Sequence, residues 1–405
     1  MSALPIPPLV SPENGRDPYP LYQLLREHSP VHWDAATSSW YISRYADVAE
    51  LLLDARLGAH DYPDVIHTLP EQDRAVIAPV EDHLARWPVF SDRPSQALLR
   101  RRLQSVLTRS AVQPLEPEIR AAVRRHVQEG LAGPADLLDD FARPAARWTV
   151  SRLLGVHAEQ EGRQLEAWSD LLIEYLRHAG LDAEVARVAL PAVTGLTSFV
   201  RDELLPRATT PMAVQLARAT EDPRIEPADV VAMVAQLVTG GIEPTATATC
   251  TAALGMSVQS SRTAGEGGVP TDDAAVVEAA LRAEPPFQFA PREAKASFDY
   301  KGHQIIKGQR VVLLLASAGR EDMAEAGTTG CPVTGAGGAG HRPRPHLAFG
   351  RGRHYCLGAP LARMHLQAAV AELRAAGVPE RLDRTAVVRD EVFGLAAYRS
   401  VPLRA

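Results

Sequence analysis

The sequence is short of cysteine, of long apolar runs and of any leader-like segment. Its 405 residues include only three cysteines, Cys250, Cys331 and Cys356, which are too few and too widely spaced for the disulfide framework of a secreted domain. The longest aliphatic run, residues 311–316, is well below the roughly 18 residues of a membrane-spanning helix. No basic stretch followed by an apolar one opens the chain. We therefore expect a reduced, cytoplasmic protein with no membrane association.

An excess of charge of one sign is also missing. The 43 lysines and arginines against 49 aspartates and glutamates give a net charge of −6, which argues against a general nucleic-acid binder. The hydrophobic content of 46% is sufficient for a large core and excludes wholesale disorder. Because no internal repeat and no Pro/Ser-rich linker interrupts the helical pattern, we expect residues 1–405 to form one domain.

Apolar periodicity predicts a mainly α fold with small β-sheets. Helices are expected over residues 19–27, 46–53 and 274–283, from Pro227 onward, and after Pro360. Strands are expected over residues 40–42 and within residues 298–316. Residues 55–92, with frequent Pro, Gly, Asp and His, are expected to form a partly irregular surface segment, and the glycine-rich residues 327–340 a loop.

One loop carries most of the chemical information. Residues 349–358 read Phe-Gly-Arg-Gly-Arg-His-Tyr-Cys-Leu-Gly, and the glycines allow the backbone to turn tightly beside a flat ligand. Cys356 stands just before a predicted helix N-terminus, where backbone amides and the helix dipole favour a thiolate. Such a sulfur is either a metal ligand or a nucleophile. Since no second cysteine nearby completes a zinc ligand set, a single axial ligand to haem iron fits better.

The loop resembles the haem-binding loop of the cytochrome P450 superfamily, because it matches Phe-Gly-x-Gly-x-His-x-Cys-x-Gly at every fixed position. Residues 92–108 and 291–294 are similar to two further segments of bacterial members. The resemblance implies the cytochrome P450 fold, with haem b between the long central helix and the helix that follows the cysteine loop. It implies that Cys356 is the axial ligand of the iron.

The resemblance also implies which side chains hold the haem. Phe349, Gly350 and Gly358 would contact it from the cysteine loop. Arg100, Arg292 and His354 would hold its propionates through charge-assisted hydrogen bonds. Gln96 stands where the family has another propionate histidine, and it can donate a hydrogen bond without carrying a charge.

The long helix departs from the family at its oxygen-activation motif. Residues 240–245 read Gly-Gly-Ile-Glu-Pro-Thr, so the acid Glu243 is present but the alcohol that normally follows it is Pro244. The resemblance implies that Glu243 and Thr245 are the catalytic residues for proton delivery. Because proline removes a backbone N–H and kinks a helix, two interpretations stay open. Pro244 either alters proton delivery or only exaggerates a kink that this helix already has in the family.

The family's Glu-x-x-Arg helix motif is altered as well. Aligned on Arg282, the usual glutamate position is Ala279, while Glu278 lies four residues from Arg282, where a helical ion pair can form. The loop before the cysteine motif is rich in glycine and lacks the family's usual arginine pattern. We therefore expect the region around the thiolate to be held differently, through Arg342 or Arg344.

The resemblance implies a bacterial haem-thiolate monooxygenase acting on a small organic molecule, free or carrier-bound, from natural-product biosynthesis. Electrons would come from NAD(P)H through a ferredoxin reductase and an acidic ferredoxin, for which Arg100–Arg102, Arg351 and Arg353 offer local positive charge. No nucleic acid or membrane partner is expected. Two alternatives remain: a peroxide-driven or oxidative-coupling haem enzyme, and a haem-binding scaffold without catalysis.

Overall fold

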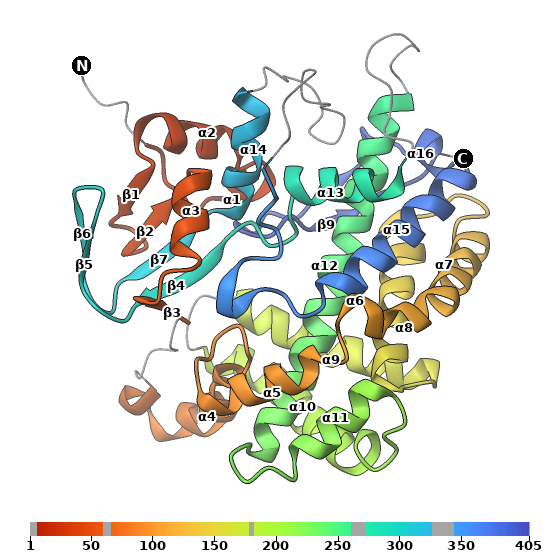
Figure 1. Cartoon of the computed structure of the whole chain (residues 1–405), viewed down its shortest axis with the longest axis horizontal. Helices are drawn as coiled ribbons and strands as arrows, with labels where there is room; N and C mark the ends of the chain where they lie inside the picture. The colour runs from red at the N-terminus through yellow and green to blue at the C-terminus, as the bar shows by residue number, and fades with distance from the viewer. Residues whose placement is uncertain (1–5, 60–65, 178–181, 261–271, 326–343, 405) are drawn as a thin grey trace. The chain divides into compact units, whose positions relative to one another are not determined.

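The computed structural model describes residues 6–59, 66–177, 182–260, 272–325 and 344–404 (Figure 1). Cys331, Arg342 and the predicted loop over residues 327–340 lie outside these ranges. The chain forms two compact units. Unit 1 comprises Met1–Gly58, Glu118–Pro144 and Pro244–Ala405, and unit 2 comprises Ala59–Pro117 and Ala145–Glu243.

Unit 1 combines helices with all the strands of the described residues. Its helices are α1 (Pro12–Arg16), α2 (Tyr19–His28), α3 (Tyr45–Leu51), the π-helix η3 (Leu137–Ala142), α13 (Asp273–Ala283), α14 (Leu315–Glu325), the 3-10 helix η5 (Gly352–His354), α15 (Ala359–Ala375) and α16 (Val378–Arg381). Its strands are β1 (Val31–Asp34), β2 (Ser39–Ile42), β3 (Leu57–Gly58), β4 (Ala290–Ala294), β5 (Phe298–Tyr300), β6 (His303–Ile305), β7 (Arg310–Leu313), β8 (Val388–Arg389) and β9 (Tyr398–Ser400).

Among its described residues, unit 2 has helices and no strands. Its helices are η1 (Ile66–Thr68), α4 (Glu71–Ala85), α5 (Pro94–Gln104), α6 (Arg109–Val112), η2 (Gln113–Leu115), α9 (Glu159–Arg177), α10 (Ala183–Phe199), η4 (Val200–Leu204) and α11 (Pro211–Ala219). Three helices contain a boundary between the units: α7 (Glu116–Gly130), α8 (Arg143–Leu154) and α12 (Pro227–Ser260). The predicted helices and strands listed by residue range above are therefore confirmed.

The main sheet of unit 1 has the strand order β1-β2-β7-β4-β3, with β2 and β7 parallel and the other neighbours antiparallel (Figure 1). Successive side chains of a strand point to opposite faces, and both faces are covered here. Trp40 and Ile42 pack with side chains of α3, whereas Tyr41 packs with side chains of α2. In β7, Val311 packs with the side chains of α3 and Val312 with those of α2. A sheet buried on both faces gives the short, continuous apolar runs from which these strands could be predicted.

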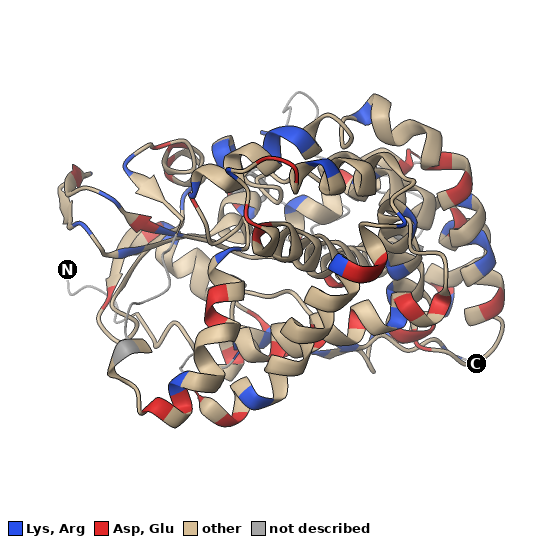
Figure 2. Ribbon diagram, turned by 90° about the horizontal axis from the view of Figure 1, so that it is seen from below, with Lys and Arg blue, Asp and Glu red and all other residues tan. Residues whose placement is uncertain are grey.

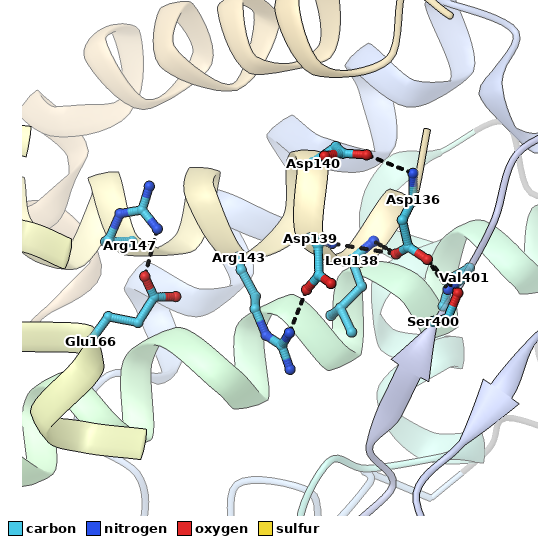
Figure 3. A network of polar contacts seen from close by, with 9 residues as sticks. All are labelled: Asp136, Leu138, Asp139, Asp140, Arg143, Arg147, Glu166, Ser400 and Val401. Atoms are coloured by element: carbon cyan, nitrogen blue, oxygen red, sulfur yellow. Dashed lines mark hydrogen bonds and ion pairs between the residues drawn. The ribbon is translucent and has the colours of Figure 1, made fainter. Parts of the chain in front are cut away.

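Asp136 joins the π-helix η3 to the strand β9 within unit 1 (Figure 3). One carboxylate oxygen caps the helix by accepting hydrogen bonds from the backbone N–H groups of Leu138 (2.8 Å) and Asp139 (3.4 Å). The other accepts from the hydroxyl of Ser400 (2.5 Å) and the N–H of Val401 (2.8 Å). One carboxylate therefore accepts hydrogen bonds from a helix N-terminus and from a strand end that are far apart in the sequence.

The segment over residues 55–92, expected to be partly irregular, contains the 15-residue helix α4, which the sequence did not indicate. Ile77, Val80 and Leu84 are fully buried at helical spacing and drive the segment into a helix. Pro79 lies on the exposed side of the same helix, where it does not interfere with this packing. Frequent proline, glycine and aspartate in the flanking sequence conceal this short periodic stretch.

Helix α10 packs against α4 and α9 within unit 2. Together with η4 it forms Ala183–Leu204, the one stretch among the described residues that is long and apolar enough to cross a membrane by length and composition. Its buried Ala186, Ala189 and Leu196 face neighbouring helices, so this criterion alone is weak evidence for a span.

Helices α8 and α9 of unit 2 are joined by Arg147, whose side chain is almost fully buried. Its guanidinium donates to Glu166 (2.5 Å) and to Glu159 (2.7 Å); the Glu166 pair is drawn in Figure 3. A buried arginine between two carboxylates is well compensated in charge, so removing either acid would leave part of that charge unpaired.

Candidate active site

The cysteine loop of unit 1 is closed by its own backbone. The N–H of Cys356 donates to the carbonyl oxygen of Phe349 (2.9 Å), and the N–H of Gly350 donates to that of Leu347 (2.8 Å). Gly350 and Gly352 have φ values of +67° and +69°, which lie in the left-handed region that glycine adopts without a steric penalty. The two glycines of the sequence motif are therefore required by the path of the chain.

The loop is also attached to the end of α3 and to β3 within unit 1. A Cβ atom on Gly352 would lie 3.0 Å from Leu53 Cδ2 and 3.2 Å from the carbonyl oxygen of Leu52. Nearby, the guanidinium of Arg353 donates to the carbonyl oxygen of Leu57 (3.1 Å). Arg353 therefore has a structural contact in addition to the surface charge expected from the sequence.

Cys356 is a partly exposed cysteine just before α15. Gly358 is the N-cap of that helix, and a Cβ atom there would lie 3.8 Å from the sulfur. The unpaired N–H groups and the dipole of a helix N-terminus stabilise a thiolate at this place. Among the residues that the structure describes, no group of three or more His, Cys, Asp or Glu side chains could hold a metal ion, so a zinc set is not assembled here.

The expected propionate ligands are divided between the two units. In unit 1, Arg292 of β4 is 5% exposed and donates to the carbonyl oxygen of Pro291 (2.8 Å), while His354 lies half-buried in η5. In unit 2, Gln96 and Arg100 lie four residues apart on α5 and so share a face of that helix. The side-chain amide of Gln96 is buried and donates to the carbonyl oxygen of Pro88 (3.3 Å).

The altered oxygen-activation motif lies within α12, which continues through Pro244. Glu243 is half-buried, and Thr245 is 9% exposed with its carbonyl oxygen accepting from the hydroxyl of Thr249 (2.8 Å). The ring of a helical proline crowds the carbonyl group four residues earlier, here that of the exposed Gly240. A glycine at that position can adjust, which explains how the helix accommodates the proline.

The buried threonines and cysteine of α12 have a packing role. Thr247, Thr249 and Cys250 are at most 2% exposed. Thr251 is also buried, and its hydroxyl forms a 3.1 Å hydrogen bond with that of Tyr398 in β9. Alternation by two along a helix places these side chains on several faces, all of which are covered in this part of unit 1.

Glu278 forms a cluster that the sequence did not reveal. Its carboxylate accepts from two guanidinium nitrogens of Arg363 on α15 (2.6 and 3.2 Å), and it lies 3.0 Å from Nε2 of His346. Burial raises the pKa of Glu278, but the hydrogen bonds from His346 and Arg363 outweigh it and bring the pKa down to about 2. Within the described residues, these two side chains are the ion-pair partners of Glu278.

The expected helical pair of Glu278 with Arg282 is therefore not the pairing that Glu278 makes. Arg282 instead donates to the backbone carbonyl of Arg344, and the guanidinium of Arg344 lies 4.8 Å from the centre of the Tyr45 ring. The sequence predicted that Arg342 or Arg344 would help to hold the region around the thiolate. Arg344 does contact Arg282, but through its backbone carbonyl and not through its guanidinium.

Proteins of known name are similar to this chain over most of its length. A vitamin D(3) 25-hydroxylase of Pseudonocardia autotrophica is 30% identical over 370 residues, covering 88% of this chain and 86% of that protein. A biotin biosynthesis cytochrome P450 of Bacillus subtilis is 26% identical over 373 residues, covering 90% of each chain. No family model matches the chain.

Solved structures agree with these relatives. CalO2 superposes with a TM-score of 0.80 at 25% identity, covering 97% of this chain and 96% of that one. P450BioI, solved with an acyl carrier protein that bears hexadec-9Z-enoic acid, superposes with a TM-score of 0.82 at 22% identity, covering 98% and 100%. The chain belongs to the cytochrome P450 superfamily and has its mainly helical fold. It is a cytochrome P450 monooxygenase, an oxidoreductase of a family whose cofactor is haem.

The cysteine loop fits that cofactor. A haem needs one axial ligand from the protein, and Cys356 is a partly exposed cysteine with a glycine, Gly358, beside its sulfur. The donor set is thus a single sulfur next to a residue without a side chain, which suits a flat macrocycle better than a small ion.

Proposed function

We propose that this chain is a haem-thiolate monooxygenase of specialised metabolism, with Cys356 as the axial ligand of haem b. The observation that carries this proposal is the partly exposed Cys356 just before α15, held by its backbone hydrogen bond to Phe349. Relatives named for biotin biosynthesis and for erythromycin C-12 hydroxylation, the latter 29% identical over 382 residues, support a biosynthetic small-molecule substrate.

When bound, the haem with its thiolate ligand supplies the redox chemistry that activates dioxygen. The chain's own residues bind and orient it. Phe349, Gly350 and Gly358 of the cysteine loop would contact it. Arg100, Arg292 and His354 would hold its propionates through charge-assisted hydrogen bonds, and the neutral amide of Gln96 would be a further donor.

Glu243 and Thr245 carry the proposed proton path. A carboxylate on α12 takes up a proton from solvent and passes it on through water, and the hydroxyl of Thr245 replaces the alcohol that Pro244 removes. The half-buried position of Glu243 supports this role, because a relay group needs contact with both water and the interior.

Electrons are proposed to come from NAD(P)H through a ferredoxin reductase and a ferredoxin in the cytoplasm. Arg351 and Arg353 are exposed on the cysteine loop, and Arg101 is exposed on α5. Basic and acidic residues are interspersed along the helices in Figure 2, so any attraction for an acidic partner comes from such local groups. A carrier-bound substrate is a further part of the proposal, supported by the P450BioI complex with an acyl carrier protein.

A peroxide-driven or oxidative-coupling enzyme is the second candidate. The observation that favours it is Pro244, since a proline cannot donate or relay a proton where the family has an alcohol. Product formed with peroxide alone, and none with NAD(P)H and a ferredoxin system, would identify this candidate. A haem spectrum that no small molecule perturbs would instead indicate a scaffold without catalysis.

The axial ligand is tested with carbon monoxide. The reduced parent protein should show the absorption band of a thiolate-ligated carbon monoxide complex, and Cys356→Ala should lose it. Cys250→Ala is the matched control, because Cys250 is fully buried in α12 and should leave the band unchanged. A normal band in Cys356→Ala, or no such band in the parent, would overturn the assignment.

A further inference from the structure

The carboxylate of Glu278 ties three separate segments of unit 1 together. It lies on α13 and is bound in a fork by Arg363 of α15, with hydrogen bonds of 2.6 and 3.2 Å. Planar guanidinium–carboxylate pairing of this kind fixes orientation as well as distance. The third segment is the chain just before the cysteine loop, which contributes His346.

His346 is held in one tautomer by its surroundings. Its Nδ1 accepts a hydrogen bond from the backbone N–H of Ala348 (3.1 Å), so in the neutral ring Nε2 carries the proton. That proton points to Glu278 Oε2, 3.0 Å away. The His346 side chain is only 3% exposed and that of Glu278 is 39% exposed, so water reaches this contact only from the side of the carboxylate.

Arg363 and His346 both contact Phe349. The Arg363 guanidinium carbon lies 4.5 Å from the centre of the Phe349 ring, and the His346 ring centre lies 5.7 Å from it at 49°. The carbonyl oxygen of Phe349 accepts the hydrogen bond from the N–H of Cys356. A continuous set of contacts therefore runs from Glu278 through Phe349 to the backbone of Cys356.

We propose that Glu278 is a positioning residue for the thiolate: through Arg363 and His346 it fixes Phe349, and through Phe349 it fixes the backbone that presents Cys356. The inference rests on the proposed function, because it takes Cys356 as the iron ligand. Without the carboxylate, Arg363 and His346 lose the anion that orients them, and the Phe349 ring loses two oriented neighbours. The sulfur then leaves the iron more readily, even where the fold persists.

The test is the rate at which the reduced, carbon monoxide-bound holoprotein loses its thiolate-type absorption band at fixed temperature. Glu278→Gln should lose the band roughly tenfold faster than the parent, as is usual when an outer-shell partner of a metal ligand is removed. The matched control is Glu372→Gln. Glu372 lies on the same helix α15 and forms a forked pair with Arg124 of α7, but it is nine residues, about two and a half turns, from Arg363. It should change the rate by less than about twofold.

Arg363→Lys keeps the positive charge but cannot form the fork or stack flat on the ring, so it should also accelerate the loss. It carries the test if Glu278→Gln does not take up haem. Thermal unfolding of each variant separates positioning from stability. The proposal is overturned if Glu278→Gln and Arg363→Lys lose the band at the parent's rate, or if Glu372→Gln accelerates the loss equally for the same fall in melting temperature. If the parent itself lacks the band, the proposed function fails instead.

Discussion

The backbone N–H of Cys356 donates a 2.9 Å hydrogen bond to the carbonyl oxygen of Phe349, which closes the cysteine loop upon itself. The position of the sulfur therefore depends on the path of the intervening residues. Gly350 and Gly352 allow that path because both adopt positive φ values. Several consequences of this closed loop, and of groups elsewhere in the chain, are open to experiment.

Gly352→Ala should destabilise the protein more than Gly350→Ala. Both substitutions force a side chain into the left-handed region at a cost of about 1–2 kcal/mol. At Gly352 the new Cβ would also lie 3.0 Å from Leu53 Cδ2 and 3.2 Å from the carbonyl oxygen of Leu52, whereas at Gly350 the nearest atom is 3.6 Å away. Melting temperatures of the holoproteins, followed by far-ultraviolet circular dichroism, give the comparison.

Gly302→Ala provides the control for backbone strain alone. Gly302 has a φ of +82° between β5 and β6, and nothing lies within 4 Å of the position of a Cβ atom. The fall in melting temperature for Gly352→Ala, minus that for Gly302→Ala, measures the cost of the contact with the end of α3. Equal melting temperatures for Gly352→Ala and Gly350→Ala would show that this contact relaxes without cost.

Arg292→Ala should release haem faster than the parent. A charge-assisted hydrogen bond contributes on the order of 1.5–3 kcal/mol, and each 1.4 kcal/mol is about tenfold in an equilibrium constant. Transfer of haem to apomyoglobin measures the loss, and we expect it to rise roughly tenfold or more. Lys295→Ala is the control, because Lys295 follows the same strand and pairs with Glu293 (3.0 Å). Equal haem loss in both variants would mean that Arg292 has a structural role and does not hold a propionate.

The local elements and the cysteine loop could be predicted because their signals are contiguous. A short continuous apolar run marks β2, because both faces of its sheet are covered, and Pro227 marks the start of α12. The support around the loop could not be predicted, since Glu278 meets Arg363 across 85 positions of sequence. Its partner His346 also comes from a different segment, and no spacing rule links an acid on one helix to a histidine in a loop.

Glu243→Gln should uncouple the enzyme without weakening substrate binding. If the carboxylate relays protons, its amide keeps the shape and polarity of the side chain but cannot accept and release a proton. Product formed per NAD(P)H consumed should therefore fall, with substrate affinity nearly unchanged. Pro244→Thr restores an alcohol at the usual position and should raise the same ratio. A collapse of affinity for an amine-bearing ligand in Glu243→Gln would mean that the acid pairs with substrate instead.

The last prediction concerns the acid side of the stability profile and depends on His365 of α15. Burial, with a further contribution from nearby His126, lowers the pKa of His365 from 6.5 to about 4. As the pH falls below 6.5, the unfolded chain takes up a proton that the folded chain refuses until about pH 4. The stability that neutral His365 allows is thus complete above pH 6.5 and is lost progressively towards pH 4.

The loss attributable to this side chain is at most about 1.4 kcal/mol per pH unit, the value of one unit of pKa difference. His365→Gln, which does not titrate in this range, should therefore show a shallower fall in the free energy of unfolding between about pH 7 and about pH 5. Urea denaturation of the holoproteins at both pH values measures it. His157→Gln removes an exposed histidine and should keep the parent's slope. If His365→Gln keeps that slope too, the acid sensitivity of the fold arises from other groups, because the one buried imidazole of α15 would then contribute nothing to it.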